Sequence, residues 1–387
     1  MNNFVYRNNT RIIFGKGRET EVGKWTVEYA QRILIVYGGG SIKTNGIYSS
    51  VINSLKNVGI EFEELGGVEP NPDVELVRKG INICKEENLQ FVLAIGGGSV
   101  IDTAKAIAFG AKYEGDVWEI FEEKIYIKDT LPTGAILTLS ASGSESGGAA
   151  VISNKAVLKK SVAGNGGCRP VFAILNPELT YTVSNFQKSC GSIDIFSHII
   201  ERYFTRQKNV GFTDSLCEAA MKTIIRYAPI ILKNKYDYDS HAQIMIAGTY
   251  ATNDLLGVGR TGDWASHEIE HQLSARYGVT HGAGLAIVIP AWMKYIYKND
   301  LERFSRYAIE VWGIKQSNNL EENAWKGIVA TENFFKDLGV KTKLLEYIPY
   351  VGNNIEDIAE KVVQGGPIGQ FKSLNKFDII EILNLAK

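Results

Sequence analysis

The first half of the chain alternates short, almost wholly apolar runs with amphipathic segments. RILIVY (residues 32–37) is apolar and β-branched, and residues 48–58 then show the 3.6-residue period of a helix. GIEFEEL, the helical segment 75–89 and FVLAI repeat the alternation. Strands this apolar suit a parallel sheet with helices on both faces, because both sides of each strand are then buried. We therefore expect an α/β domain built on a parallel sheet.

Beyond about residues 176–184 this alternation stops and long helical patterns replace it. The run GLAIVIPAWM indicates buried core rather than a membrane span, since a span needs roughly 18 or more apolar residues. We predict an α/β domain over residues 1–184 and an all-α domain over residues 185–387, because a chain of 387 residues is too long for one ordinary core. The helices expected in the second domain are 187–204, 213–232, 242–256, 264–275, 283–297, 301–311 and 320–338.

The composition narrows the class of protein. Hydrophobic residues make up 45% of the chain and charged residues 22%, and the net charge of −1 gives no reason to expect nucleic acid or an anionic membrane as a partner. The amino-terminal sequence lacks the charged and apolar regions of a secretory signal. The four cysteines form no CxxC pair and are typical of reduced, buried thiols, so we expect a cytoplasmic protein.

Two strand ends carry the same glycine-rich turn, GGGS at residues 38–41 and again at 96–99. Neither turn matches the GxGxxG fingerprint. Glycines at the carboxyl end of a parallel strand nevertheless let the backbone approach a phosphate, and a helix that begins there offers unpaired N–H groups. The second turn is the better candidate because a helix clearly follows it; the alternative is that both clusters only close tight turns. A third stretch, LTLSASGSESGGAA, has the hydroxyls and glycines of a loop around a polar ligand.

Four of the five histidines have ligand-like spacing with one aspartate: the residues are Asp194, His198, His267, His271 and His281. Asp194 and His198 are four residues apart, as are His267 and His271, so each pair shares one face of a helix. Imidazole with carboxylate suits Fe²⁺ or Zn²⁺, whereas Ca²⁺ and Mg²⁺ favour oxygen ligands. Each residue alone would be an ordinary solvated or hydrogen-bonded side chain, but their joint spacing indicates a metal site that also includes His281.

The sequence of residues 267–271, HEIEH, also matches the HExxH motif of zinc proteases, with Glu268 as the general base. The extended form of that motif would need glycine and histidine where Ser274 and Tyr277 stand. A protease also leaves the upstream Asp–His pair and the glycine turns unexplained. A metallohydrolase therefore stays a distant alternative.

Ordered motifs along essentially the whole chain carry a family resemblance. They are IIFGKG, LIVYGGGSIKTNG, GVEPNP, AIGGGSVIDTAKAIA, TLSASGSE, PVFAILNPELTYT, DIFSHIIE, DWASHEIEHQLSA and THGAGLAIV. On these motifs the chain resembles the iron-containing (group III) metal-dependent alcohol dehydrogenases, most closely their butanol dehydrogenase branch. The resemblance implies a Rossmann-like dinucleotide-binding domain at residues 1–184, a helical metal-binding and catalytic domain at residues 185–387, and a homodimer.

The resemblance also implies a cofactor site. The family loop commonly reads TTAGTGSE; here Leu139 replaces a threonine and offers only backbone groups, whereas Ser142 keeps a hydroxyl. The residues expected to bind the cofactor are Gly38, Gly39, Gly40, Ser41, Asn71, Gly97, Gly98, Ser99, Asp102, Thr138, Leu139, Ser142, Lys160 and Leu179.

The implied reaction is reversible hydride transfer between NAD(P)(H) and a primary alcohol or its aldehyde, such as butanol and butanal. His271 is our candidate for relaying the proton to solvent, because a neutral imidazole titrates in the useful range; its alternative role is packing beside the ligands. Trp264 and other aromatic residues are expected to wall an apolar substrate pocket. The metal is expected to be Fe²⁺, with Zn²⁺ compatible with the same ligands, which are Asp194, His198, His267 and His281.

The sequence gives a partial indication of whether NADP(H) or NAD(H) is preferred. NAD-preferring relatives often carry an acidic residue after the first strand, which binds the ribose 2′-OH, whereas Gly38 stands here with Lys43 close by. Small residues and a cation tolerate a 2′-phosphate, so NADP(H) is favoured and NAD(H) stays open.

Three other functions remain open from the sequence. A glycerol-dehydrogenase-like polyol oxidoreductase would share the architecture. A dehydroquinate-synthase-like enzyme would too, but it would need a cluster of basic residues, and the segments flanking the predicted ligands show few. The third is a metal-stabilised binding module without turnover.

Overall fold

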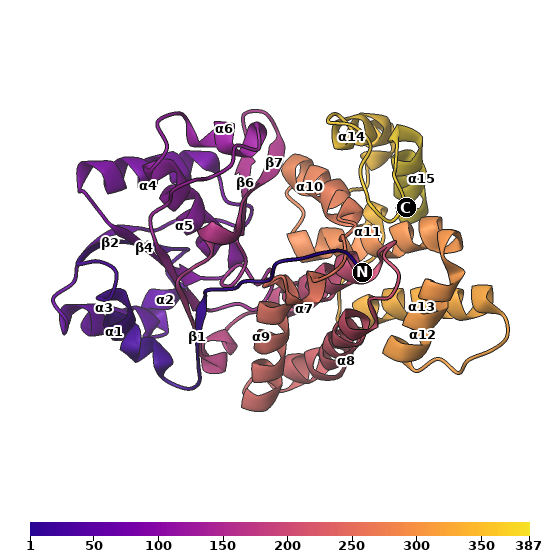
Figure 1. The fold of residues 1–387 in the computed structure, drawn as a ribbon, viewed down its shortest axis with the longest axis horizontal. Helices are drawn as coiled ribbons and strands as arrows, with labels where there is room; N and C mark the ends of the chain where they lie inside the picture. Colours follow the sequence, from indigo (N-terminus) through magenta and orange to yellow (C-terminus); the bar gives the residue numbers. More distant parts are fainter. The chain divides into compact units, whose positions relative to one another are not determined.

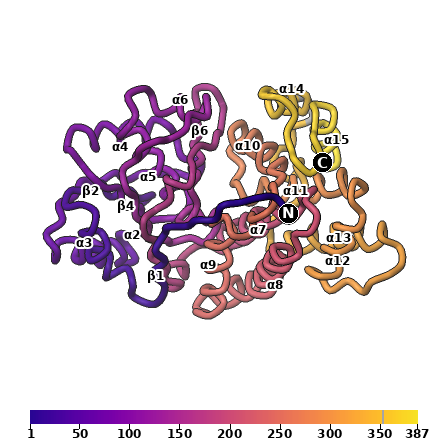
Figure 2. The backbone as a smooth tube through the Cα atoms, in the orientation of Figure 1, coloured from indigo at the N-terminus to yellow at the C-terminus, as the bar shows by residue number. Residues whose placement is uncertain are grey.

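The chain forms two compact units in the computed structural model, which describes residues 1–351 and 354–387 (Figure 2). The α/β unit comprises Arg7–Val183 and Gly248–Asn253, and the helical unit comprises Met1–Tyr6, Ser184–Ala247 and Asp254–Lys387. The amino-terminal residues thus belong to the helical unit, and the last turn of helix α9 (Tyr238–Thr252) belongs to the α/β unit. The division predicted between residues 184 and 185 did not include either of these two assignments.

A six-stranded, fully parallel sheet forms the centre of the α/β unit (Figure 1). Its strands lie in the order β1-β8-β5-β4-β2-β3. The chain moves outward from β2 to β3 and returns on the other side of β2 with β4, so the strand order reverses between β2 and β4. Ligands bind at such a point in open parallel sheets. The strands are β1 (Arg11–Phe14), β2 (Arg32–Tyr37), β3 (Glu61–Leu65), β4 (Phe91–Gly96), β5 (Thr133–Leu137) and β8 (Phe172–Leu175).

Helices cover both faces of this sheet, with α1 and α3 on one side and α4 and α5 on the other (Figure 1). Ile33 and Ile35 of β2 belong to one apolar core with Val51 and Leu55 of α3. Every residue of β4, β5 and β8 is buried, which explains why these strands are apolar throughout. The expected fold class is confirmed. The helices are α1 (Val22–Thr26), α2 (Ser41–Thr44), α3 (Ile47–Lys56), α4 (Val74–Glu86), α5 (Gly98–Ala111) and α6 (Val117–Glu122).

A separate antiparallel hairpin, β6 (Ala149–Asn154) and β7 (Lys159–Gly164), follows the loop after β5. The sequence did not predict it, because its connection, KAVL, contains none of the Asn-Gly or Asp-Gly signals of a tight hairpin turn. A Cβ at Gly148 would lie 2.2 Å from the carbonyl oxygen of Asn165, so glycine lets the two ends of the hairpin close together.

The helical unit is built around α11, whose run of residues 282–293 is entirely buried. Helices α7, α10, α13 and α15 all pack on it, which confirms that GLAIVIPAWM is core. Within the described ranges, none of the helices combines the length and apolar character that a bilayer span requires. Helices α14 and α15 were not predicted. The helices, besides α9, are α7 (Asn185–Tyr203), α8 (Gly211–Lys233), α10 (Ala265–Tyr277), α11 (His281–Ile296), α12 (Leu301–Trp312), α13 (Leu320–Asp337), α14 (Ile355–Val362) and α15 (Lys376–Ala386).

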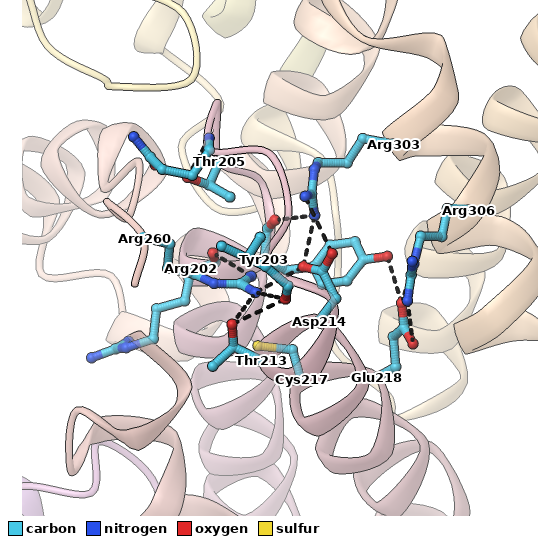
Figure 3. A network of polar contacts seen from close by, with 12 residues as sticks. Arg202, Tyr203, Thr205, Thr213, Asp214, Cys217, Glu218, Arg260, Arg303 and Arg306 are labelled. Atoms are coloured by element: carbon cyan, nitrogen blue, oxygen red, sulfur yellow. Dashed lines mark hydrogen bonds and ion pairs between the residues drawn. The ribbon is translucent and has the colours of Figure 1, made fainter. Parts of the chain in front are cut away.

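A buried ionic network fixes the carboxyl end of α7 against α8 and α12 (Figure 3). Asp214 accepts hydrogen bonds from Arg260 at 2.8 Å and from Arg303 at 3.0 Å. Glu218 accepts one from the hydroxyl of Tyr203 at 2.9 Å. Buried charges are tolerated only when they are paired in this way, and removing one partner leaves the other as an uncompensated buried charge. The network therefore holds rigid the helix that carries the first two predicted ligands.

Candidate metal centre and cofactor turns

Helix α7 presents Asp194 and His198 on one face. The helix begins after Ser184, whose hydroxyl accepts a hydrogen bond from the Gln187 amide and caps the first turn. Asp194 is buried, with 4% of its surface exposed, and its Oδ1 lies 3.3 Å from Nε2 of His198. The spacing of four residues therefore places both side chains together.

The remaining histidines come from two consecutive helices. Helix α10 carries His267 and His271, and it ends at Gly278, whose φ of 66° is a left-handed conformation that glycine adopts readily. Helix α11 then begins at His281. The ring centroid of His267 lies 4.6 Å from that of His198 and 5.4 Å from that of His281, and the His271 and His281 centroids are 5.8 Å apart. The short turn between α10 and α11 thus delivers three histidines to one place.

The four predicted ligands converge on a site that fits a divalent cation. Asp194, His267 and His281 each bring one ligand atom to within 4.8 Å of the others. Asp194 Oδ1 lies 3.3 Å from Nε2 of His198 and 3.5 Å from Nε2 of His281, yet this buried oxygen makes no hydrogen bond to any described residue. A buried carboxylate oxygen left between imidazole nitrogens is costly unless a cation satisfies it. Three imidazoles and one carboxylate suit Fe²⁺ or Zn²⁺.

The electrostatics of the cluster favour the metal-binding forms of these side chains. Burial acts to raise the pKa of Asp194, but the imidazoles of His281 and His198 outweigh it and hold that pKa at about 2. Burial lowers the pKa of His198, because a charged imidazole would lose its hydration. At neutral pH the carboxylate is therefore charged and His198 is neutral, as metal binding requires.

Two fully buried carboxylates accept hydrogen bonds from two of the candidate ligand histidines. Glu201 accepts hydrogen bonds from Nδ1 and from the backbone amide of His267, both at 3.1 Å, and Glu270 accepts one from Nδ1 of His281. A histidine that donates from Nδ1 keeps Nε2 for a metal. The sequence reasoning missed both roles. The available signal was the spacing: Glu201 follows His198 by three residues and Glu270 follows His267 by three.

Glu270→Gln is expected to weaken metal binding about 10- to 100-fold, because His281 loses the charge that orients it and makes it basic. Competition with a chelator measures the dissociation constant without any turnover. Glu268→Gln is the matched control, since it removes the same charge from a half-buried position on the same helix. The control should keep the affinity of the unmodified protein. Equal weakening by both substitutions would contradict the role given to Glu270.

Trp264 packs directly on two of the predicted ligands. Its φ of 66° is rare for a bulky residue, and Glu201 accepts its amide hydrogen bond at 2.7 Å in that conformation. The ring centroid lies 5.8 Å from that of His198 and 5.4 Å from that of His267, and Arg202 stacks on the indole at 4.6 Å. Nδ1 of His198 is buried without a hydrogen bond to any described residue. The ring of His198 is therefore oriented by packing against Trp264, whereas His267 and His281 are oriented by hydrogen bonds to carboxylates.

Four predicted cofactor turns lie along one edge of the parallel sheet. Strands β8, β5, β4 and β2 are neighbours and run in the same direction, so the segments that follow them, 176–179, 138–142, 97–99 and 38–41, leave from the same edge. The amide of Thr138 donates a hydrogen bond to the carbonyl of Gly96 at 3.0 Å, which ties two of these turns together. The carboxyl edge of an open parallel sheet is where nucleotide phosphates bind.

The second glycine turn needs its glycines for space. A Cβ at Gly97 would lie 3.1 Å from Cβ of Leu139, and a Cβ at Gly98 would lie 2.3 Å from Oγ of Ser142. Helix α5 begins at Gly98 and runs for 14 residues, and its N-cap, Gly97, makes no side-chain cap hydrogen bond. Bare amides at the start of a helix are suited to a phosphate. The structure therefore brings four predicted cofactor residues together.

The other predicted cofactor residues lie outside this turn. Asp102 is buried on α5, where it accepts hydrogen bonds from the hydroxyl of Ser144 and, at 3.0 Å, from the amide of Val151. One carboxylate oxygen thus ties α5 to the loop after β5, and the other ties it to β6. Asn71 has a φ of 55° ahead of α4, Lys160 is buried on β7, and Leu179 is half-buried in the turn after β8.

A parallel sheet with phosphate-type turns and a helical unit with a buried carboxylate–imidazole cluster are the parts of a metal-dependent dehydrogenase. The chain belongs to the iron-containing alcohol dehydrogenase family. The profile "Iron-containing alcohol dehydrogenase" matches residues 9–177, and "Fe-containing alcohol dehydrogenase family, C-terminal" matches residues 189–386. Both profiles agree with the resemblance inferred from the motifs.

Named relatives cover nearly the whole chain. NADH-dependent butanol dehydrogenase A of Clostridium acetobutylicum is 43% identical over 99% of this chain and 99% of its own length. NADPH-dependent aldehyde reductase YqhD of Escherichia coli is 39% identical over 95% and 94%. The crystal structure of NADH-dependent butanol dehydrogenase A from Thermotoga maritima superposes with a TM-score of 0.95 at 38% identity, covering 100% of this chain and 99% of that one. The relatives thus include users of either nicotinamide cofactor.

Proposed function

We propose that the protein is a metal-dependent alcohol dehydrogenase and aldehyde reductase. It transfers hydride reversibly between NAD(P)(H) and a primary alcohol or its aldehyde, such as butanol and butanal. The observation that carries the proposal is Asp194 Oδ1, a buried carboxylate oxygen that lies between two imidazole nitrogens without a hydrogen bond. The names of the relatives, butanol dehydrogenase and aldehyde reductase, support the substrate class.

The protein's own residues prepare the reaction by holding a metal and orienting its ligands. Bound Fe²⁺, or Zn²⁺, would polarise the substrate oxygen as a Lewis acid, and the nicotinamide would supply or accept the hydride. Glu201 and Glu270 fix the tautomers of two ligand histidines, and Trp264 fixes the ring of a third. The residues that would hold the metal are Asp194, His198, His267 and His281.

The cofactor is held by the turns at the carboxyl edge of the sheet, and we propose that NADP(H) is preferred and NAD(H) accepted. Gly38 stands where an acidic residue would otherwise reject a 2′-phosphate. Lys43 in α2 adds a cation beside this turn. The named relatives include an NADPH-dependent and an NADH-dependent enzyme, so either cofactor preference is compatible with this family.

His271→Ala is expected to lower turnover roughly 100-fold while the metal content stays unchanged, because His271 moves the alcohol proton towards solvent without binding the metal. The residue is buried beside His281, and its ring centroid lies 6.5 Å from that of His267. Steady-state assays and metal analysis of the same sample measure both quantities. Added imidazole should restore part of the turnover if the role is proton transfer. Loss of metal from this variant would instead support the HExxH interpretation.

Isotope transfer tests the proposed reaction directly. Reduction of butanal with NADPH or NADH that carries deuterium at both positions of nicotinamide C4 should yield butanol with one deuterium at C1, detected by mass spectrometry. Dihydroxyacetone and glycerol serve as parallel substrates. Faster turnover of these polyol substrates than of butanal and butanol would replace the proposed substrate class with the polyol class. Absence of deuterium from every product would overturn hydride transfer.

Three further properties belong to the proposal. Residues 1–184 would act as the dinucleotide-binding domain and residues 185–387 as the metal-binding domain, which accords with the two profiles. The four cysteines are buried and unpaired, which supports a cytoplasmic location. A homodimer is proposed from the family resemblance, and light scattering measures the mass in solution.

A further inference from the structure

A polar cluster lies beside the first glycine turn, and of its side chains only that of Lys43 has a part in the proposed cofactor site. Tyr37, the last residue of β2, and Tyr48 of α3 both donate hydroxyl hydrogen bonds to Glu64 of β3, the first at 2.8 Å. The ammonium of Lys43 in α2 lies 3.6 Å from Oε2 of Glu64. It also lies over both tyrosine rings, 4.9 Å and 4.8 Å from their centroids. Four elements of the α/β unit thus converge on one carboxylate and one cation.

The backbone fixes this cluster at the turn. Gly67 N–H donates to the carbonyl of Gly38 at 2.9 Å, and Val68 N–H donates to the carbonyl of Tyr37 at 3.3 Å. A Cβ at Gly66 would lie 2.6 Å from the ring of Tyr37, so glycine is needed for that ring to lie against the segment after β3. The chain that follows Glu64 is therefore bound to the turn that follows β2.

Both charged groups keep their charge at neutral pH. Burial acts to raise the pKa of Glu64, but hydrogen bonds from Tyr48 and Tyr37 outweigh it and lower that pKa. The contact with Tyr37 is the main reason that the pKa of Lys43 is raised. The side chain of Glu64 is 28% exposed, so its field reaches the surface of the turn. The cation that the sequence offers to a 2′-phosphate is therefore already shared with an anion.

We infer that Glu64 is a specificity-determining residue for the cofactor. From the neighbouring strand it supplies the carboxylate that is missing directly after β2: it partly neutralises Lys43, repels a 2′-phosphate and leaves the ribose 2′-hydroxyl of NAD(H) acceptable. Lys43 and Glu64 then act in opposite directions on the same phosphate, and their balance sets how strongly NADP(H) is preferred. This inference rests on the proposed function, since it presumes that the turn at residues 38–41 binds the adenosine ribose.

Binding of two nucleotides to the full-length protein tests the inference without metal or turnover. Adenosine 2′,5′-bisphosphate carries the 2′-phosphate and adenosine 5′-monophosphate lacks it, and calorimetry gives a dissociation constant for each. Glu64→Gln keeps an acceptor for the tyrosines but removes the charge, so it should tighten the bisphosphate about tenfold and leave the monophosphate nearly unchanged. Lys43→Met should weaken the bisphosphate by about the same factor.

Glu63→Gln is the matched control, because it removes the same charge from the adjacent, exposed residue on the opposite face of β3. It should leave the ratio of the two dissociation constants unchanged. An equal change in both nucleotides with Glu64→Gln, or the same change in ratio with Glu63→Gln, would overturn the inference and leave the proposed function intact. Failure of the unmodified protein to bind either nucleotide would overturn the cofactor assignment, and the inference with it.

Discussion

We expect the Asp194→Ala protein to lose its metal and its dehydrogenase activity together. Asp194 contributes the only carboxylate of the predicted ligand set, and its Oδ1 lies within 3.5 Å of two imidazole nitrogens. Without this charge, three imidazoles would have to bind a dication alone in a buried site. A Lewis-acidic metal contributes several kcal/mol to carbonyl polarisation, so activity should fall by roughly a thousandfold or more. Metal analysis after dialysis and NAD(P)H oxidation with butanal measure the two losses in one sample.

His267→Ala should give the same double loss, because it removes a ligand from a different helix. His241→Ala is the control, since His241 is buried in the same helical unit but lies outside the cluster of predicted ligands. The His241→Ala protein should retain its metal, even if replacing a buried histidine by the smaller alanine lowers the stability of the fold. Full metal content in either ligand variant would refute the ligand assignment.

Gly282→Ala is expected to destabilise the helical unit by about 3 kcal/mol, the upper end of the usual cost of overpacking. A Cβ at this position would lie 2.1 Å from the backbone oxygen of Cys190 in α7, and backbone cannot rotate out of the way as a side chain can. Helix α11 would have to move away from α7. Because His281 immediately precedes Gly282, the same displacement would separate His281 from Asp194 and weaken metal binding.

Denaturant unfolding of the metal-free protein measures the stability loss separately from the metal. Gly211→Ala is the matched control: it adds the same methyl group at the start of α8, where nothing lies within 4 Å of the new Cβ. The control should unfold like the unmodified protein. If Gly282→Ala also does so and binds metal normally, the close packing of α11 on α7 is not what positions His281.

The sheet and the grouping of the candidate ligands were predictable because each depends on short-range patterns. The strand 32–37 was predicted with its observed bounds, since an apolar run ending in glycines defines both the strand and its end. The proximity of Asp194 and His198 was predictable because helical periodicity places them on one face of α7. The start of α9 was missed by four residues, because Tyr238 and its neighbours are polar and carry little helical pattern.

Roles that depend on which helices pack together could not be read from the sequence. HEIEH draws attention to Glu268, yet the carboxylate that holds His281 is Glu270, and this contact exists only because α11 folds back on α10. Glu201 reaches His267 across two helices that are far apart in the chain. Glu64 became visible only when the register placed β3 beside β2, so that a residue from the next strand could meet Lys43. Such pairings are set by tertiary packing, which local patterns do not encode.

The central claim is that the buried carboxylate–imidazole cluster holds a metal required for hydride transfer. The most direct measurement follows NADPH and NADH oxidation at 340 nm with butanal, using one sample stripped by chelator and then restored separately with Fe²⁺ and Zn²⁺. We expect negligible oxidation by the stripped protein, recovery with at least one of the two metals, and faster oxidation of NADPH than of NADH. Oxidation at full rate by the stripped protein, or no recovery with either metal in a sample that has rebound it, would contradict the claim.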